Sequence, residues 1–116
     1  MTTEKTSERP AHAPTRGRHV PNAGSAEAAA VELASATPPD VVIVDPPRKG
    51  LEPALRAGLC AHPPTRLVYV SCGLESFLED ARALLATGRV TLGALEAWAF
   101  LPFTDHVEVL ARFDAR

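Results

Sequence analysis

The feature that most constrains the fold is a run of four β-branched apolar residues, Val-Val-Ile-Val at 41–44, which lies between Asp40 and Asp45. A continuously apolar run of this kind is typical of a strand covered on both faces within a parallel sheet. A second run, Leu-Val-Tyr-Val at 67–70, has the same character. Because parallel strands need a long crossover between them, usually a helix, the two runs predict an α/β fold.

Three segments have the composition or spacing of helices. Residues 25–35 are rich in alanine, with Ser25 as a candidate N-cap, and the segment ends before a pair of prolines. Apolar residues recur at helical spacing from Leu51 to Leu59, where Pro53 is tolerable in a first turn. The clearest helical spacing covers residues 74–85 and ends before Gly88.

The C-terminal part contains two more expected strands, at 90–100 and 106–113. The connection between them, residues 101–105, is too short for a parallel crossover, so this pair is predicted to be antiparallel. The order strand, helix, strand, helix and antiparallel pair corresponds to half of a doubly wound α/β sheet. The predicted fold class is therefore a partial α/β domain with a mixed sheet.

The chain divides into two expected regions. Residues 1–24 contain hardly any large apolar side chain, so we expect a disordered tail there and a partial domain at 25–116. Because no further strand is expected before residue 41, the strand at 41–44 should form an unpaired apolar edge of the sheet. Such an edge favours self-association.

Composition excludes several classes of protein. The 14 acidic and 12 basic side chains give a net charge of −2, so nothing in the overall charge attracts nucleic acid. No apolar run is long enough to cross a bilayer and the N-terminus does not resemble a signal peptide, which predicts a cytoplasmic protein without a membrane partner. The two cysteines cannot form a disulfide framework, and the histidine spacing supports no metal site.

Reactive side chains are expected to meet at one edge of the sheet. Asp45 directly follows the first run and Cys72 lies two residues after the end of the second, at the carboxyl ends where open parallel sheets bind ligands. The last strand runs in the opposite direction, so its first residues, His106 and Glu108, should lie at the same edge. Three separate segments thus bring two acids and a thiol to one place.

Each of these residues also has a simpler interpretation. Cys72 could be a nucleophile whose thiolate is favoured by Gly73 and the start of a helix, or a small buried side chain in a tight turn. Glu108, between two valines, could be a general base or an edge-strand carboxylate. Asp45 before two prolines could contact a ligand or belong to a structural turn.

Two further features are less specific. Arg48 and Lys49 are adjacent cations that could contact phosphate, although such pairs on loops are often only solvated. Cys60 is flanked by Leu59 and Ala61, so we expect it in the core.

Three motifs, in this order and spacing, resemble the closing motifs of the RNA uracil-5 methyltransferases of the RumA/TrmA type. They are Asp45-Pro46-Pro47-Arg48-Lys49-Gly50, Tyr69-Val70-Ser71-Cys72-Gly73 and Pro102-Phe103-Thr104-Asp105-His106-Val107-Glu108. The resemblance covers residues 40–115 and only the final part of a full-length member.

The resemblance implies the C-terminal half of a Rossmann-like methyltransferase domain that uses S-adenosyl-L-methionine and acts on a uridine of rRNA or tRNA. Cys72 matches the nucleophile of the family and Glu108 the base that removes a proton. Asp45 matches an acid at the pocket for the methyl donor and the target base. Under this interpretation Arg48 and Lys49 would contact the RNA.

The chain also departs from the family. Gly73 stands where members commonly have Asn, and no glycine-rich turn between a strand and a helix precedes Asp45. We therefore expect an incomplete fragment with little activity on its own. The alternatives are a non-catalytic interaction module and a remnant of an amino-group methyltransferase, in which Cys72 and Glu108 would be dispensable.

Overall fold

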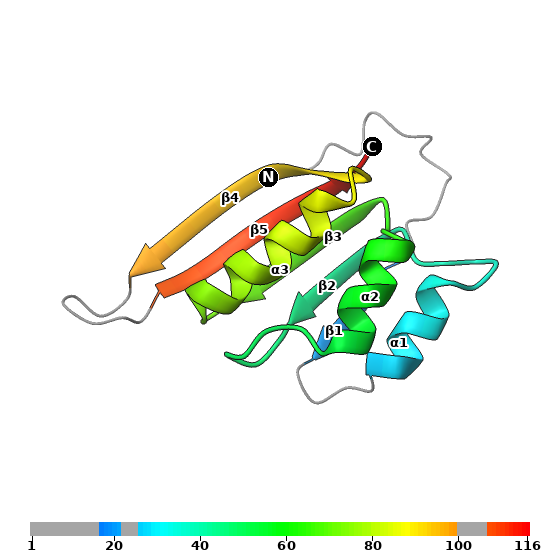
Figure 1. Ribbon diagram of the computed structural model, residues 1–116, viewed down its shortest axis with the longest axis horizontal. Helices are drawn as coiled ribbons and strands as arrows, with labels where there is room; N and C mark the ends of the chain where they lie inside the picture. The colour runs from blue at the N-terminus through cyan, green and yellow to red at the C-terminus, as the bar shows by residue number, and fades with distance from the viewer. Residues whose placement is uncertain (1–16, 22–25, 100–106) are drawn as a thin grey trace.

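The computed structural model describes residues 17–21, 26–99 and 107–116 and contains one five-stranded mixed sheet with three helices (Figure 1). The strand order is β1-β2-β3-β5-β4; the first three strands are parallel, and β5 is antiparallel to both of its neighbours. In chain order the elements are β1 (Gly17–Pro21), α1 (Ala26–Leu33), β2 (Val41–Asp45), α2 (Pro53–Ala61), β3 (Arg66–Ser71), α3 (Leu74–Ala86), β4 (Val90–Ala99) and β5 (Val107–Ala115).

All three helices lie on one face of the sheet (Figure 1). The chain moves from β1 through β2 to β3 in one direction, and right-handed crossovers then place successive helices on the same side. The core lies between the two layers. On the sheet side its most buried members are Val42, Val44, Leu67, Tyr69, Val109, Ala111 and Phe113, and on the helix side they include Leu55, Leu59, Phe77 and Leu84.

The opposite face of the sheet, which we call the open face, carries the alternate residues of the same strands: Ile43, Val68, Val70 and Leu110. Ile43 is 36% exposed, and no helix of the described ranges covers it. The expectation that the strand at 41–44 is covered on both faces is therefore wrong for the part of the chain that the structure describes. In the described residues, one face of this apolar run packs on helices and the other face is open.

Two other expectations need correction. A strand, β1, occupies Gly17–Pro21, so the expected disordered tail is wrong for these five residues; residues 1–16 and 22–25 of that tail lie outside the described ranges. This strand pairs in parallel with β2 along its whole length. β2 is therefore an interior strand and not the expected edge, and the edges of the described sheet are β1 and β4.

The C-terminal pair is antiparallel, as the short connection predicts. The expected strands at 90–100 and 106–113 correspond to β4 and β5, whereas residues 100–106, His106 among them, lie outside the described residues. The register shifts between Leu92 and Ala94, where Gly93 provides the extra residue of a bulge. β5 lies between β3 and β4, so it connects the last strand of the parallel set to the edge of the sheet.

Among the described helices, none has the length and apolarity that a membrane span requires.

Candidate active site

The carboxyl ends of β2 and β3 and the beginning of β5 meet at one end of the sheet. Asp45 is the last residue of β2, Cys72 directly follows β3, and Glu108 is the second residue of β5. Ser71 and Val109 form the last pair of the β3–β5 ladder, and Cys72 and Glu108 each lie one position beyond it. The register thus brings Cys72 and Glu108 to corresponding positions on neighbouring strands.

Asp45, Cys72 and Glu108 are all at least partly exposed to solvent at this end of the sheet. Cys72 is exposed, which rules out the interpretation of a small buried side chain. Asp45 is exposed and follows Val44, whose side chain is buried against the helices, while Glu108 is half-buried and precedes the buried Val109. Because side chains alternate along a strand, Asp45 and Glu108 both point toward the open face.

Cys60, the other thiol, lies in a different environment. It is partly buried on α2, packs against the core, and its Sγ donates to the carbonyl oxygen of Ala83 at 3.7 Å. Burial raises the pKa of the Cys60 thiol. Cys60 thus lies at the margin of the core and not fully within it as expected, and its thiol is poorly suited to act as a nucleophile.

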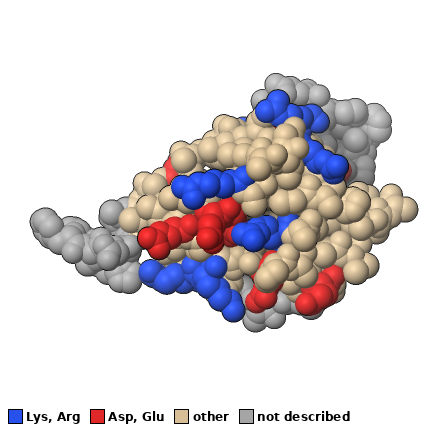
Figure 2. Space-filling view, in the orientation of Figure 1, with Lys and Arg blue, Asp and Glu red and all other residues tan. Residues whose placement is uncertain are grey.

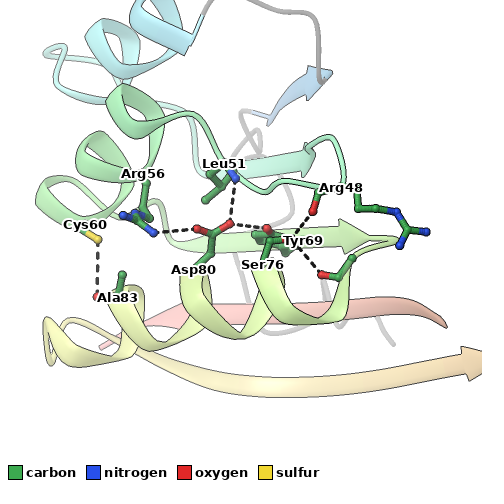
Figure 3. Close-up of polar contacts among 9 residues, drawn as sticks. Arg48, Leu51, Arg56, Cys60, Tyr69, Ser76, Asp80 and Ala83 are labelled. Carbon is green, nitrogen blue, oxygen red and sulfur yellow. Dashed lines mark hydrogen bonds and ion pairs between the residues drawn. The ribbon is translucent and has the colours of Figure 1, made fainter. Parts of the chain in front are cut away.

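The loop after β2 carries the two candidate RNA contacts. Pro47 and Gly50 close a turn, in which the Gly50 N–H donates to the Pro47 carbonyl oxygen at 2.8 Å, and Arg48 and Lys49 are exposed at its tip. Gly50 has a φ of +98°, which favours glycine. The Arg48 carbonyl accepts a hydrogen bond from the Ser76 hydroxyl, while the Arg48 guanidinium points away from these contacts (Figure 3).

This loop also lies against the turn that contains Cys72. A Cβ atom placed on Gly73 would come within 2.5 Å of the Arg48 carbonyl oxygen. The Gly73 N–H in turn donates to the Ser71 hydroxyl at 3.0 Å. The first two motifs are therefore in direct contact, and the close approach of the Arg48 backbone explains why glycine occupies position 73 in this chain.

Charge on the helix-bearing face is mixed. Figure 2 shows Lys and Arg side chains in several separate groups, with Asp and Glu between them. Among the described residues visible in this view, the positive groups form no continuous surface for a phosphate backbone. This agrees with the net charge of −2. The loop that carries the exposed Arg48 and Lys49 lies against Gly73, next to Cys72.

One important residue of this region was missed in the sequence. Asp80 is buried on α3, at 3% exposure, and its carboxylate accepts hydrogen bonds from three elements (Figure 3). The donors are the Leu51 backbone N–H at 2.9 Å, the Tyr69 hydroxyl at 2.6 Å and the Arg56 guanidinium at 3.2 Å. Asp80 therefore links α3 by hydrogen bonds to the loop after β2, to strand β3 and to helix α2.

The signal for Asp80 is present in the helical spacing. Asp80 lies three residues after Phe77 and four before Leu84, so it falls on the buried stripe of α3 between two core residues. An acid in that position must have partners, because an unpaired buried carboxylate costs several kcal/mol. Attention to acids inside apolar stripes would have identified it.

The partnership with Asp80 changes the ionisation of Tyr69. Burial, followed by the hydrogen bond to Asp80 and the negative charge of that carboxylate, raises the pKa of Tyr69 far above its ordinary value. The unfolded chain would ionise this tyrosine near pH 10. Neutral Tyr69 therefore contributes stability that is fully present below pH 10 and is lost as the pH rises above it, at about 1.4 kcal/mol per pH unit.

We expect no tyrosinate absorbance from the folded protein as the pH passes through 10, because Tyr69 is the only tyrosine of the chain. The band should appear together with the loss of circular dichroism, since ionisation requires unfolding. A near-ultraviolet absorbance titration followed beside circular dichroism measures both, with the urea-unfolded chain as the reference. Tyrosinate that forms at pH 10 with the fold intact would contradict the buried Tyr69–Asp80 pair.

The fold and this edge define a partial α/β domain of the Rossmann-like methyltransferase class. A family model described as tRNA (Uracil-5-)-methyltransferase matches residues 29–113. The chain belongs to this family, and the resemblance seen in its three motifs is confirmed.

Curated relatives support the same family assignment. An RNA methyltransferase of Nostoc sp. is 42% identical over 73 residues, which are 63% of this chain and 16% of the relative. The tRNA (uracil(54)-C(5))-methyltransferase of Pyrococcus abyssi is 41% identical over 73 residues, 63% of this chain and 17% of that protein. The chain thus spans less than a fifth of the length of these relatives.

A solved structure supports the same conclusion. The crystal structure of the Pyrococcus abyssi tRNA (uracil-54, C5)-methyltransferase in complex with S-adenosyl-L-homocysteine matches with a TM-score of 0.57 and 39% sequence identity. The match covers 68% of this chain and 19% of that one. The predicted fold class, a partial Rossmann-like domain with a mixed sheet, is therefore confirmed.

Proposed function

We propose that this chain carries the acceptor-activating part of an S-adenosyl-L-methionine-dependent RNA uracil-5-methyltransferase, acting on a uridine of rRNA or tRNA in the cytoplasm. The observation that carries the proposal is the register of β3 and β5, in which Cys72 and Glu108 both lie one position beyond the pair of Ser71 and Val109. A nucleophile and a base from separate strands can then reach the same pyrimidine.

The chemistry explains why these two residue types are needed. Carbon 5 of uracil is a weak nucleophile; addition of the Cys72 thiolate to carbon 6 moves the electron pair of the double bond onto carbon 5 as an enolate. Once carbon 5 has formed its new bond, Glu108 removes the proton that carbon 5 still carries. The electrons of that C–H bond restore the double bond and expel the thiolate, which leaves Cys72 unchanged.

The described residues fit only part of a site for S-adenosyl-L-methionine. Asp45 supplies one exposed carboxylate at the end of β2, whereas the residues between β1 and α1 lie outside the described ranges. When bound, the cofactor supplies the methyl group; we assign most of its binding to polypeptide that relatives contain and this chain does not. Asp45 is proposed to contribute to that pocket.

RNA binding is proposed to use Arg48 and Lys49. Both side chains are exposed on the loop that packs directly against Gly73, next to the nucleophile. A phosphate held there would place its nucleotide at the same edge of the sheet. The target uridine must also leave its stack before Cys72 can reach carbon 6.

The acceptor chemistry can be tested without the methyl donor. After thiolate addition, carbon 5 can take a proton from water, and Glu108 can then remove either hydrogen; the label of uridine tritiated at carbon 5 is therefore released to solvent. We expect the purified chain to release tritium from such an RNA, while methyl transfer from S-adenosyl-L-methionine stays at background.

The result separates the competing functions. An interaction module would bind the RNA without releasing tritium, and an amino-group methyltransferase would not need the thiol for its reaction. Absence of release at RNA concentrations that saturate binding would contradict the proposal.

A further inference from the structure

Among the described residues, Trp98 is the large aromatic residue that is exposed near the candidate site. It is the only tryptophan of the chain, lies near the end of β4, and is 41% exposed. Its partner across the β4–β5 ladder is Glu108. The residue proposed as the base and the exposed indole are therefore direct neighbours.

Both side chains lie on the open face. Residues paired across a ladder point to the same side of a sheet, and Glu108 alternates with the buried Val109. Leu95, also exposed on β4, pairs with the buried Ala111 and so belongs to the helix-bearing face. Trp98 and Leu95 thus lie on opposite faces of the sheet, and Trp98 is on the same face as the candidate site.

The strand order arranges three side chains in a row. Cys72 follows β3, Glu108 is on β5 and Trp98 is on β4, and these strands are consecutive in the sheet. With strands about 4.8 Å apart, the row from Cys72 to Trp98 spans about 10 Å. A pyrimidine lying over this row can contact the thiol, the carboxylate and the indole.

The charges around Trp98 favour a base over a phosphate. Glu96 precedes Trp98 by two residues on the same face, where it pairs with Leu110, and Glu108 lies across the ladder. Two carboxylates repel a phosphate, whereas the flat indole stacks on nucleobases of any kind. The exposed cations Arg48 and Lys49 lie toward the opposite side of the row, after β2.

We propose that Trp98 stacks against a nucleobase of single-stranded, uridine-containing RNA at this edge and so positions the RNA over Cys72 and Glu108. The choice of RNA as ligand rests on the proposed function; the position of the indole does not. Trp98 is a positioning residue in this proposal, because it touches the RNA and takes no part in bond formation.

The single tryptophan makes a direct test available. Titration of the full chain with an oligouridylate of about 12 nucleotides should quench the indole fluorescence in a saturable manner, because a stacked base quenches an indole. An oligomer of the same length with abasic ribose phosphates should not quench it. Cys72→Ala should be quenched like the unsubstituted chain, since stacking needs no thiolate.

Affinity provides the second readout. Trp98→Leu should raise the Kd for fluorescein-labelled oligouridylate about 5- to 100-fold, and Trp98→Phe should restore most of the affinity because the ring can still stack. Leu95→Ala, on the same strand but the other face, is the matched control and should leave the Kd unchanged. Fluorescence anisotropy of the labelled RNA measures the Kd of all three variants.

The outcomes separate this inference from the proposed function. Quenching without tritium release would support the stacking role and overturn the proposed chemistry. Tritium release without quenching would overturn the stacking role alone. If Trp98→Leu leaves the RNA affinity unchanged and converts a dimer to a monomer in sedimentation, the indole is a self-association contact and the inference is wrong.

Discussion

Replacing Cys72 by Ala is expected to reduce tritium release from carbon 5 of uridine by about 10³-fold or more, because without a thiolate at carbon 6 the carbon 5 enolate does not form. Cys72 is exposed, so removing its sulfur should leave the core intact. The unfolding midpoint in urea should therefore match that of the unsubstituted chain. The measurement is the initial rate of label release at saturating RNA.

Two matched variants sharpen this result. Cys60→Ala removes the other thiol, which is partly buried on α2, and should leave the rate of release unchanged. Glu108→Gln should lower the rate but still allow an adduct at Cys72, since the amide keeps the shape of the carboxylate and cannot remove a proton. Equal rates for Cys72→Ala and the unsubstituted chain would show that the release does not proceed through this thiol.

Replacing Asp80 by Ala is expected to lower the free energy of unfolding by about 2–5 kcal/mol. The substitution leaves the Leu51 N–H and the Tyr69 hydroxyl without their acceptor and removes the ion-pair partner of Arg56. Because domains of this size are stable by only about 5–15 kcal/mol, the loss is a large fraction of the total. Urea denaturation followed by circular dichroism measures it.

The neighbouring acid on α3 supplies the control. Glu79→Ala removes an exposed carboxylate from the same helix and should change stability by less than about 0.5 kcal/mol. Asp80→Asn keeps one acceptor oxygen, so its free energy of unfolding should lie between those of Asp80→Ala and Glu79→Ala. If Asp80→Ala were as stable as Glu79→Ala, the three hydrogen bonds would contribute nothing net to folding.

Asp80 also connects stability with the site. Its bond to the Leu51 N–H holds the end of the loop that carries Arg48, and the same loop lies against Gly73. In Asp80→Asn, which should remain folded, we expect the affinity for oligouridylate to fall because the loop loses part of its anchor. The pKa of Tyr69 should also fall, although burial, the main cause of its rise, remains.

Local patterns predicted the elements well. The apolar runs at 41–44 and 67–70 became β2 and β3, and the three helical segments became α1, α2 and α3. The short connection at 101–105 predicted the antiparallel pair, because five residues cannot carry a parallel crossover. These features depend on neighbours in the chain, so the sequence contains enough information to predict them.

Non-local pairing explains the errors. β1 was missed because Gly17–Pro21 has little apolar character of its own and pairs only with β2, a strand distant in the chain. The coverage of β2 was misjudged because a β-branched run looks the same whether one face or both are packed. The helical spacing of α3 marks Asp80 as buried, but its three hydrogen-bond partners come from other elements and no local pattern indicates them.

By itself the sequence determined the strands, the helices and the placement of Asp45, Cys72 and Glu108 next to strand ends, because propensity, periodicity and connection length act over short distances. Only the tertiary structure decided that Glu108 lies one step beyond the Ser71–Val109 pair, that Trp98 lies beside Glu108, and that Asp80 joins three elements. These relations depend on strand register and helix packing between distant segments, which no local pattern specifies.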